Sequence, residues 1–297
     1  MVATPTTVEA AGRPIAPRRA GRRWTLVVVV AVAVAWSISG LEVTMDRLLG
    51  APGDAWDVFR RMVPPAFGEA VDRGVPGKVL ESVHIAWIGT LIGAVLSLPL
   101  AFLAAGNVAP VWIRTPVRQL FNVIRAVPEL ILAVILIPIT GLGPWAGALA
   151  IGVHSVGTLG KWATEAIEGV DPGPLEAVAA TGGRWVSGMR WGVLPQVLPV
   201  VTSQWLFRFE INVRASAVLG MIGAGGVGSE LVSQLVFRNF PAVGAVLAMT
   251  IVVVLAIDTA SAAVRRRIIR GAVSGVDEGE ADRNAAVLTD LTGIRTP

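Results

Sequence analysis

The sequence predicts an all-α membrane protein with six transmembrane helices, and three observations support this fold class. Of the 297 residues, 54% are hydrophobic and only 15% are charged, and the mean hydropathy is +0.67. A soluble domain usually carries about 25% charged residues, so this chain has too few charges to cover a water-facing surface. Long apolar stretches recur along the chain, and arginines gather at both ends of the series.

Six stretches approach the roughly 20 apolar residues that a helix needs to cross a bilayer core of about 30 Å. They are residues 24–41, 79–105, 117–140, 144–164, 197–219 and 241–264. The first lacks a convincing small-residue cleavage site and further stretches follow it, so we expect a retained helix rather than a signal peptide. In the third stretch, Pro138 is expected to introduce a kink near the outer end.

The placement of arginines predicts a multi-pass protein of the plasma (inner) membrane with both termini cytoplasmic. Arginines precede the first stretch and follow the last one: Arg13, Arg18, Arg19, Arg22 and Arg23, then Arg265, Arg266, Arg267 and Arg270. Six spans satisfy the even number that this orientation requires. Residues 42–77 then lie outside, with an amphipathic helix around Trp56 and Phe59 at the interface. The tails 1–23 and 269–297 are expected to be disordered.

The connection between the fourth and fifth stretches, residues 165–195, is predicted to be a cytoplasmic loop with its own short helices. Asp171 and Pro172 are typical of a helix start, and Gly182-Gly183 would end that helix. A second short helix would follow. A rigid helix–glycine–helix protrusion suits docking on a soluble partner, and an interfacial loop with no partner is the alternative.

The same loop resembles a family signature. Glu176-Ala177, Gly182 and Leu194-Pro195 match the EAA signature of permeases from binding-protein-dependent ABC importers, with mild departures at Val178 and Gly192. The resemblance implies the type I ABC importer permease fold, with residues 78–268 forming a core of five transmembrane helices. It also implies that the loop is a coupling helix that docks on an ATPase. The coupling residues would be Glu176, Ala177, Gly182 and Gly183.

Longer segments resemble the phosphonate-importer branch of these permeases. They are Ile124-Arg125 together with Pro128-Glu129-Leu130, then residues 152–161 and, most strongly, residues 207–228. The resemblance implies import of phosphonate or a related small phosphorus oxyanion, such as phosphite or phosphate, by alternating access. It implies a homodimer of this chain, two cytoplasmic ATPase subunits that bind ATP and Mg, and an extracytoplasmic substrate-binding protein, all in contact with membrane lipid.

Four polar residues interrupt the fifth stretch: Arg208, Glu210, Asn212 and Arg214. A charge at the bilayer centre costs about 2.5–3.5 kcal/mol on insertion scales, so these charges need partners. Glu210 and Arg214 are expected to pair with each other as acid and base four residues apart. Arg208 would then be the surplus cation, which meets either an anion in the pathway or Glu129 on the third stretch. A network that only holds the bundle together is the alternative.

Arg125 and His154 complete the candidates for the translocation pathway, because both lie in the segments that resemble the family. Gly223, Gly225, Gly226 and Gly228 contain a GxGxxG pattern. A dinucleotide site requires a preceding strand and a βαβ unit, whereas this pattern follows a membrane helix. We therefore expect a helix break that allows close packing, with an anion cradle of backbone amides as the alternative.

Several functions are excluded or disfavoured by the sequence. The chain has no cysteine and no metal-ligand constellation, and its net charge of +4 is explained by membrane-edge arginines rather than nucleic-acid binding. A P-loop is absent, because Ser155 stands at the first glycine position before Gly160-Lys161. We expect no catalytic residues, metal or cofactor on this chain. The alternatives are an ion-gradient-driven anion transporter and, less favoured, a membrane-embedded lipid enzyme using His154 and Glu129.

Overall fold

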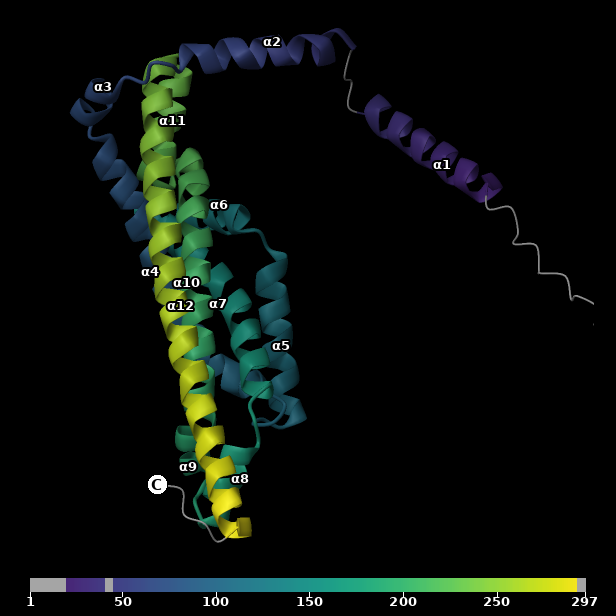
Figure 1. Cartoon of the computed structure of the whole chain (residues 1–297). Helices are drawn as coiled ribbons and strands as arrows, with labels where there is room; N and C mark the ends of the chain where they lie inside the picture. The colour runs from purple at the N-terminus through teal and green to yellow at the C-terminus, as the bar shows by residue number, and fades with distance from the viewer. Residues whose placement is uncertain (1–19, 41–44, 293–297) are drawn as a thin grey trace, which may run out of the picture. The chain divides into compact units, whose positions relative to one another are not determined.

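The computed structural model describes residues 20–40 and 45–292, and all regular elements in these two ranges are helical (Figure 1). The chain divides into two units, residues 1–60 and 61–297, which are described separately. The first unit holds α1 (Ala20–Ser39) and most of α2 (Met45–Arg61). Helix α1 covers most of the predicted first stretch, and α2 is the predicted helix of the external segment, with the rings of Trp56 and Phe59 stacked 5.8 Å apart.

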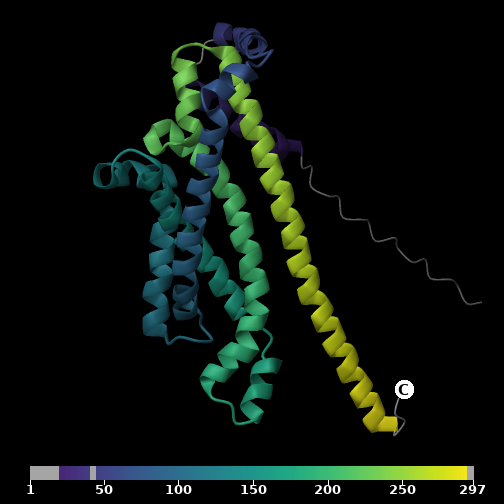
Figure 2. The same ribbon diagram turned by 90° about the vertical axis from the view of Figure 1, so that its left-hand side faces the viewer.

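The second unit is a bundle of helices with a protruding loop. Its elements are α3 (Phe67–Asp72), α4 (Val75–Ala104), α5 (Val111–Ala126), α6 (Glu129–Thr140), α7 (Pro144–Glu168), α8 (Gly173–Ala180), α9 (Trp185–Ser187), the π-helical turn η1 (Gly188–Val193), α10 (Leu194–Leu219), the π-helical turn η2 (Gly220–Ala224), α11 (Gly226–Val236) and α12 (Phe240–Thr292). The axes of α4, α7, α10 and α12 are roughly aligned, with α10 antiparallel to the other three, and α8 and α9 lie at the opposite end from α3 and α11 (Figures 1 and 2).

Small residues allow α4 and α7 to pack closely at the centre of this unit. A Cβ atom added at Gly89 would lie 2.6 Å from Cγ2 of Ile151, and one at Gly152 would lie 2.9 Å from Cγ2 of Ile92. Such close approach of backbones is the usual way in which membrane helices gain packing energy. The pairing explains why the apolar core of this region is built from Ile85, Ile151 and several alanines.

The number of spans remains a prediction. Among the described residues, α4 and the segment Phe240–Ile269 of α12 are long and apolar enough to cross a membrane, and two bent helix pairs would raise the number to four. The apolar part of α1, Trp24–Ser37, is shorter. Helix α7 is long enough but rich in small and polar residues, many of which are buried by its neighbours.

The predicted third stretch is divided by a sharp bend. Helices α5 and α6 meet at 90°, and the break falls at Val127 and Pro128 rather than at Pro138, which lies inside α6. Proline has no amide hydrogen and forces the preceding residue out of the helical region. Val127 accordingly has the extended dihedral angles φ −93° and ψ 117°. The kink expected at Pro138 stays a prediction, and the 90° bend at Val127 and Pro128 is a feature that the sequence analysis did not predict.

The glycine-rich segment after α10 breaks the helix where the sequence predicted a break. Gly223, Gly225 and Gly226 have φ values of 101°, 76° and 69°, a region that side chains rarely adopt. The chain turns by 59° between the segments Trp185–Ala224 and Gly226–Val236. A Cβ atom at Gly228 would collide with the carbonyl oxygen of Ala217, so α11 folds back closely on the end of α10.

At the other end of the chain, residues 269–292 differ from the expectation of a disordered tail. They continue α12 as a helix as far as Thr292. No proline occurs between residues 242 and 296, so nothing in this segment removes a backbone donor or forces the helix to stop. The N-terminal tail up to residue 19 and residues 293–297 lie outside the described residues.

Candidate functional site

A buried polar cluster joins α4, α7 and α10. The Oγ atom of Ser155 on α7 accepts hydrogen bonds from Nε of Arg208 and from Nδ2 of Asn212, both at 3.1 Å. Asn212 also donates to Oγ1 of Thr90 on α4, at 2.8 Å. Arg208 and Asn212 are four residues apart, so both project from one face of α10. Their side chains are buried, with Asn212 and Ser155 completely inaccessible.

Glu129 extends the cluster to α6. Its Oε2 atom lies 3.7 Å from Nη2 of Arg208 and 3.4 Å from Nε2 of His154. The other ring nitrogen of His154 lies 3.1 Å from the carbonyl oxygen of Val127 at the bend. The bend therefore delivers Glu129, the first residue of α6, to the cluster, and the N-terminus of that helix favours its negative charge. Of the two partners that the sequence predicted for Arg208, the structure shows the carboxylate.

The ion pair between Arg208 and Glu129 leaves one donor unused. Nη2 of Arg208 is buried and has no hydrogen-bond partner among the described residues, because 3.7 Å exceeds hydrogen-bonding distance. Glu129 is partly accessible and lines a pocket of about 260 Å³ together with Pro128, Leu130, Ala215 and Val218. Arg208 therefore has a buried donor without a hydrogen bond to any described residue, and its ion-pair partner Glu129 lines the pocket.

The predicted ion pair between Glu210 and Arg214 is wrong. Oε1 of Glu210 lies 3.3 Å from Nη1 of Arg265, and Nη1 of Arg214 lies 2.9 Å from Oδ2 of Asp258. Both partners belong to α12, which packs along α10. Its Arg265 lies opposite Glu210, and its Asp258 lies opposite Arg214. Asp258 is the only carboxylate in the stretch 241–264, and this feature of the sequence could have indicated an interhelical partner.

Sequence reasoning also missed Ser155 and Thr90. Their hydroxyl groups are the acceptors that hold Arg208 and Asn212 in place. Serine and threonine are common in apolar helices, so only their position opposite the charged face of α10 could have marked them. Arg125 lies in the last turn of α5 and is exposed, and it forms no ion pair with a described residue. Its side chain packs on α7 near Gly157 without a hydrogen bond to the described members of the cluster.

The predicted loop forms a helix, a tight turn and a second helical segment. The amide of Gly183 donates to the carbonyl of Val178, and the amide of Gly182 donates to that of Ala179, both at 3.0 Å. With φ of 72° at Gly182, this is the Schellman arrangement that ends α8. At the start of the loop, Oδ1 of Asp171 accepts from the amide of Gly173 at 2.9 Å. The first helix and its glycine turn agree with the sequence prediction, whereas the N-cap is Pro172 rather than Asp171 and the second short helix continues through η1 into α10.

Several residues of the loop are exposed on its surface. Glu176 and Ala177 on α8 are exposed, and so are Gly182 and Gly183 at the turn. Three large apolar side chains beyond the turn are also exposed, Trp185 at 64%, Val186 at 66% and Trp191 at 67%. Contiguous exposed apolar surface rimmed by polar residues is typical of an interaction site.

The departures of the loop from the family signature have structural roles. A Cβ atom at Gly192 would lie 2.6 Å from Cδ1 of Leu175, so the missing side chain lets α8 pack against η1. Val178 contacts the turn, where a Cβ atom at Gly183 would lie 2.7 Å from its carbonyl oxygen. Both departures thus lie at close contacts within the loop.

The helical bundle with its protruding loop has the fold of type I ABC importer permeases. The fold matches that of the MetNI methionine ABC transporter in an inward-facing conformation, with a TM-score of 0.57 and 23% identity over 64% of this chain and 94% of that one. It also matches an amino acid ABC transporter, with a TM-score of 0.58 and 20% identity over 68% of this chain and 98% of that one.

Sequence comparison then assigns the family. Residues 97–270 match the family model described as binding-protein-dependent transport system inner membrane component, so the chain belongs to this family. The phosphite transport system permease protein PtxC of Stutzerimonas stutzeri is 37% identical over 81% of this chain and 86% of its own length. The putative phosphite transport system permease protein HtxC of the same species is 34% identical over 86% and 90%.

A third relative is longer than this chain. The phosphate-import permease protein PhnE of Mycolicibacterium smegmatis is 42% identical over 71% of this chain, but the match covers only 40% of that protein. The family membership identifies the chain as a multi-pass inner-membrane component of an ABC transporter.

Proposed function

We propose that this chain is the membrane-spanning subunit of an ATP-driven importer for phosphonate or a related small phosphorus oxyanion, such as phosphite or phosphate. The relatives described above are named for phosphite or phosphate transport, and two of them align over most of their length. The transport mechanism is alternating access, in which ATP hydrolysis by a partner exposes the substrate pathway to the inside.

The observation that carries the choice of an anion is the unused donor of Arg208. A guanidinium group presents parallel N–H donors that fit the oxygens of phosphorus oxyanions. Ser155 fixes Nε of this side chain at 3.1 Å, while Glu129 holds Nη2 only loosely at 3.7 Å. An oxyanion entering from the pocket beside Glu129 would compete with this carboxylate for Nη2. Asn212 and His154 would contribute further polar contacts along the same path.

The protruding loop supports the coupling role. Glu176 and Ala177 present an exposed face of α8, and the turn at Gly182-Gly183 orients the apolar side chains beyond it. We assign this surface to contact with a cytoplasmic ATPase, which would bind ATP and Mg. The complete importer would contain a second copy of this chain, two ATPase subunits and an extracytoplasmic binding protein, with both termini of this chain cytoplasmic.

The role of Arg208 can be tested by transport in proteoliposomes that contain the permease with its ATPase and binding protein. Arg208→Gln should abolish uptake of phosphite and methylphosphonate while ATPase subunits remain bound. Arg214→Gln is a matched control, because it removes an equal charge from the same helix but from the pair facing α12. Uptake by the Arg208→Gln protein equal to that of the Arg214→Gln control would contradict the direct role.

Folding must be separated from transport in this test. Removing Arg208 leaves Glu129 without its cation, so the double variant Arg208→Gln with Glu129→Gln removes both charges together. If the double variant is as stable as the wild type in detergent and still transports phosphite, Arg208 and Glu129 serve the bundle and not the substrate.

A further inference from the structure

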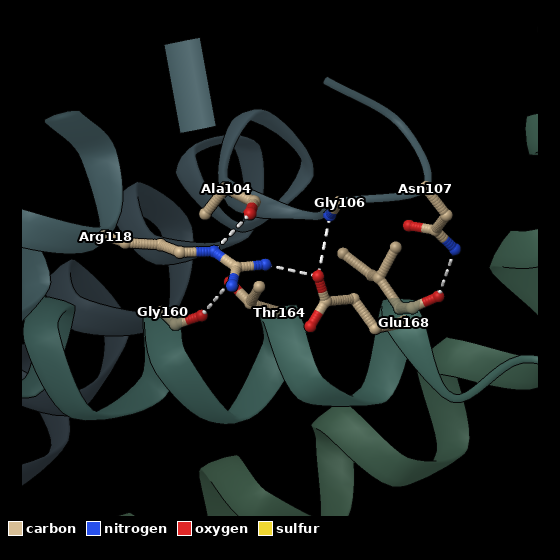
Figure 3. A network of polar contacts seen from close by, with 8 residues as sticks. Ala104, Gly106, Asn107, Arg118, Gly160, Thr164 and Glu168 are labelled. Atoms are coloured by element: carbon tan, nitrogen blue, oxygen red, sulfur yellow. Dashed lines mark hydrogen bonds and ion pairs between the residues drawn. The ribbon is translucent and has the colours of Figure 1, made fainter. Parts of the chain in front are cut away.

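A polar network connects the last residue of α7, immediately before the protruding loop, to α5 and to the end of α4 (Figure 3). Glu168 is the last residue of α7, and its Oε1 atom accepts a hydrogen bond from the amide of Gly106 at 2.7 Å. The same oxygen pairs with Nη2 of Arg118 on α5. Nε of Arg118 donates to the carbonyl oxygen of Ala104, at the end of α4, at 2.9 Å. We call these four residues the α5–α7 clasp.

The clasp lies at the base of the protruding loop. Helix α8 begins at Gly173, five residues after Glu168. The connecting segment is held on its other side by Gln196 of α10, whose side chain accepts from the amide of Asp171 at 2.9 Å and donates to its carbonyl oxygen at 3.2 Å. The loop is therefore anchored to α10 by Gln196 and to the turn between α4 and α5 by Glu168.

The apolar core beneath the loop joins every neighbouring helix except α5. Leu175 of α8 packs on a cluster formed by α4, α7, η1 and α10, whose buried members are Ala101, Ala105, Ala163, Ile167, Val193, Val197 and Val201. A displacement of α8 must carry these helix ends with it, because packed interiors move as units rather than deform continuously. Helix α5 supplies no residue to this cluster, and it packs instead in a separate cluster formed by Phe121, Ala104 of α4 and Val156 of α7. Among the described residues, the clasp is the polar link between α5 and the base of the loop.

Helix α5 leads directly to the buried polar cluster. It ends at Ala126, and after the bend at Val127 and Pro128 the chain delivers Glu129 to Arg208. A movement of the inner end of α5 would therefore change the position of Glu129. An exposed ion pair alone contributes little to stability, but Glu168 holds two donors at once and Arg118 bridges two helices, which gives this pair a defined geometry.

We propose that the α5–α7 clasp is a positioning element that transmits the displacement of α8 to α5 and thereby to Glu129. The inference rests on the proposed function, since it assumes that an ATPase moves α8. The clasp takes no part in binding substrate. Its loss should leave ATP hydrolysis in place and lower the amount of substrate imported per ATP.

The test compares Glu168→Ala with Glu165→Ala in proteoliposomes that contain the permease, its ATPase and its binding protein, with phosphite as the substrate. Glu165 lies one turn earlier on α7, and its side chain pairs, within the described part of the chain, with Lys161 of the same helix at 3.9 Å, in an exposed position. Glu168→Ala should retain ATP hydrolysis while the phosphite imported per ATP falls about fivefold or more, the lower end of typical coupling between sites. Glu165→Ala should stay within about twofold of the wild type, as expected for a surface pair. Equal ratios in the two variants would overturn the proposal.

A structural readout guards against misfolding. Hydrogen exchange at the amide of Gly106 should be faster in Glu168→Ala than in Glu165→Ala in the isolated permease, because this amide loses its acceptor. If Glu168→Ala fails to assemble, Arg118→Lys replaces it, since a lysine cannot bond Ala104 and Glu168 together through a planar fork. An unchanged transport ratio in Arg118→Lys would then overturn the proposal. Absence of ATP-dependent uptake in the wild type would instead contradict the proposed function, and the exchange at Gly106 would still show whether the clasp forms.

Discussion

Ser155 is predicted to be the main structural support of the buried cluster, and its replacement by alanine tests this directly. The hydroxyl group is completely inaccessible and accepts bonds from Arg208 and Asn212. Hydrogen bonds between membrane helices contribute about 0.6 kcal/mol on average and up to about 1.7 kcal/mol. One of the two donors here is charged, and bonds to charged groups are worth about 1.5–3 kcal/mol. We therefore expect Ser155→Ala to lower the free energy of unfolding by about 2 kcal/mol.

Ser97→Ala is the matched control for this prediction. Ser97 is also completely buried, but its hydroxyl group donates only to the carbonyl oxygen of Ala94 in its own helix, at 3.2 Å. Its loss should cost less than about 0.5 kcal/mol, because such bonds within a helix add little or nothing to stability. Equilibrium unfolding of both variants in mixed detergent measures the difference. Equal unfolding free energies for the two variants would refute the assignment of Ser155 as the support of Arg208.

Three further perturbations test the packing, the turn and the corrected ion pairs. Gly160→Ala should destabilise the protein by about 1–3 kcal/mol because a Cβ atom there collides with the ring of Phe121; unchanged thermal stability would contradict the close packing of α5 on α7. Gly182→Val should cost about 1–3 kcal/mol at φ 72° and weaken ATPase co-purification, whereas Gly182→Asn should be tolerated; equal behaviour of the two would count against the left-handed turn. A double-mutant cycle on Arg214 and Asp258 should give a coupling of about 0.2–1 kcal/mol, and additive effects would show that this pair does not form.

The helical class, the helix–glycine–helix form of the loop 165–195 and the glycine-rich break could be predicted because each depends on local information. Gly182 at the end of α8 and the glycines after α10 permit backbone conformations with positive φ, and this effect depends on those residues alone. The bend between α5 and α6 also has a local cause, but the stretch contains two prolines, Pro128 and Pro138, and the sequence does not show which one divides the helix. Pro128 broke the helix, while Pro138 was accommodated within α6.

The pairing of charges could not be predicted from one helix. The rule that favours Glu210 with Arg214 describes an isolated helix, and here α12 lies alongside with Asp258 and Arg265 at the matching levels. The partner of Arg208 was predictable because Glu129 is a carboxylate in another apolar stretch. The spacing of hydroxyl residues carries no comparable signal, and only the packing of three helices defines the cluster.

We propose that this permease imports a phosphorus oxyanion, driven by ATP that a partner docked on the α8 loop hydrolyses. Uptake of phosphite into proteoliposomes is the most direct test, measured for the assembled permease, ATPase and binding protein with ATP present or absent and with ion gradients abolished. Uptake should require ATP and should disappear when residues 176–182 are replaced. Phosphite uptake driven by an ion gradient without ATP, or ATP-driven uptake that survives replacement of the loop, would contradict the proposal.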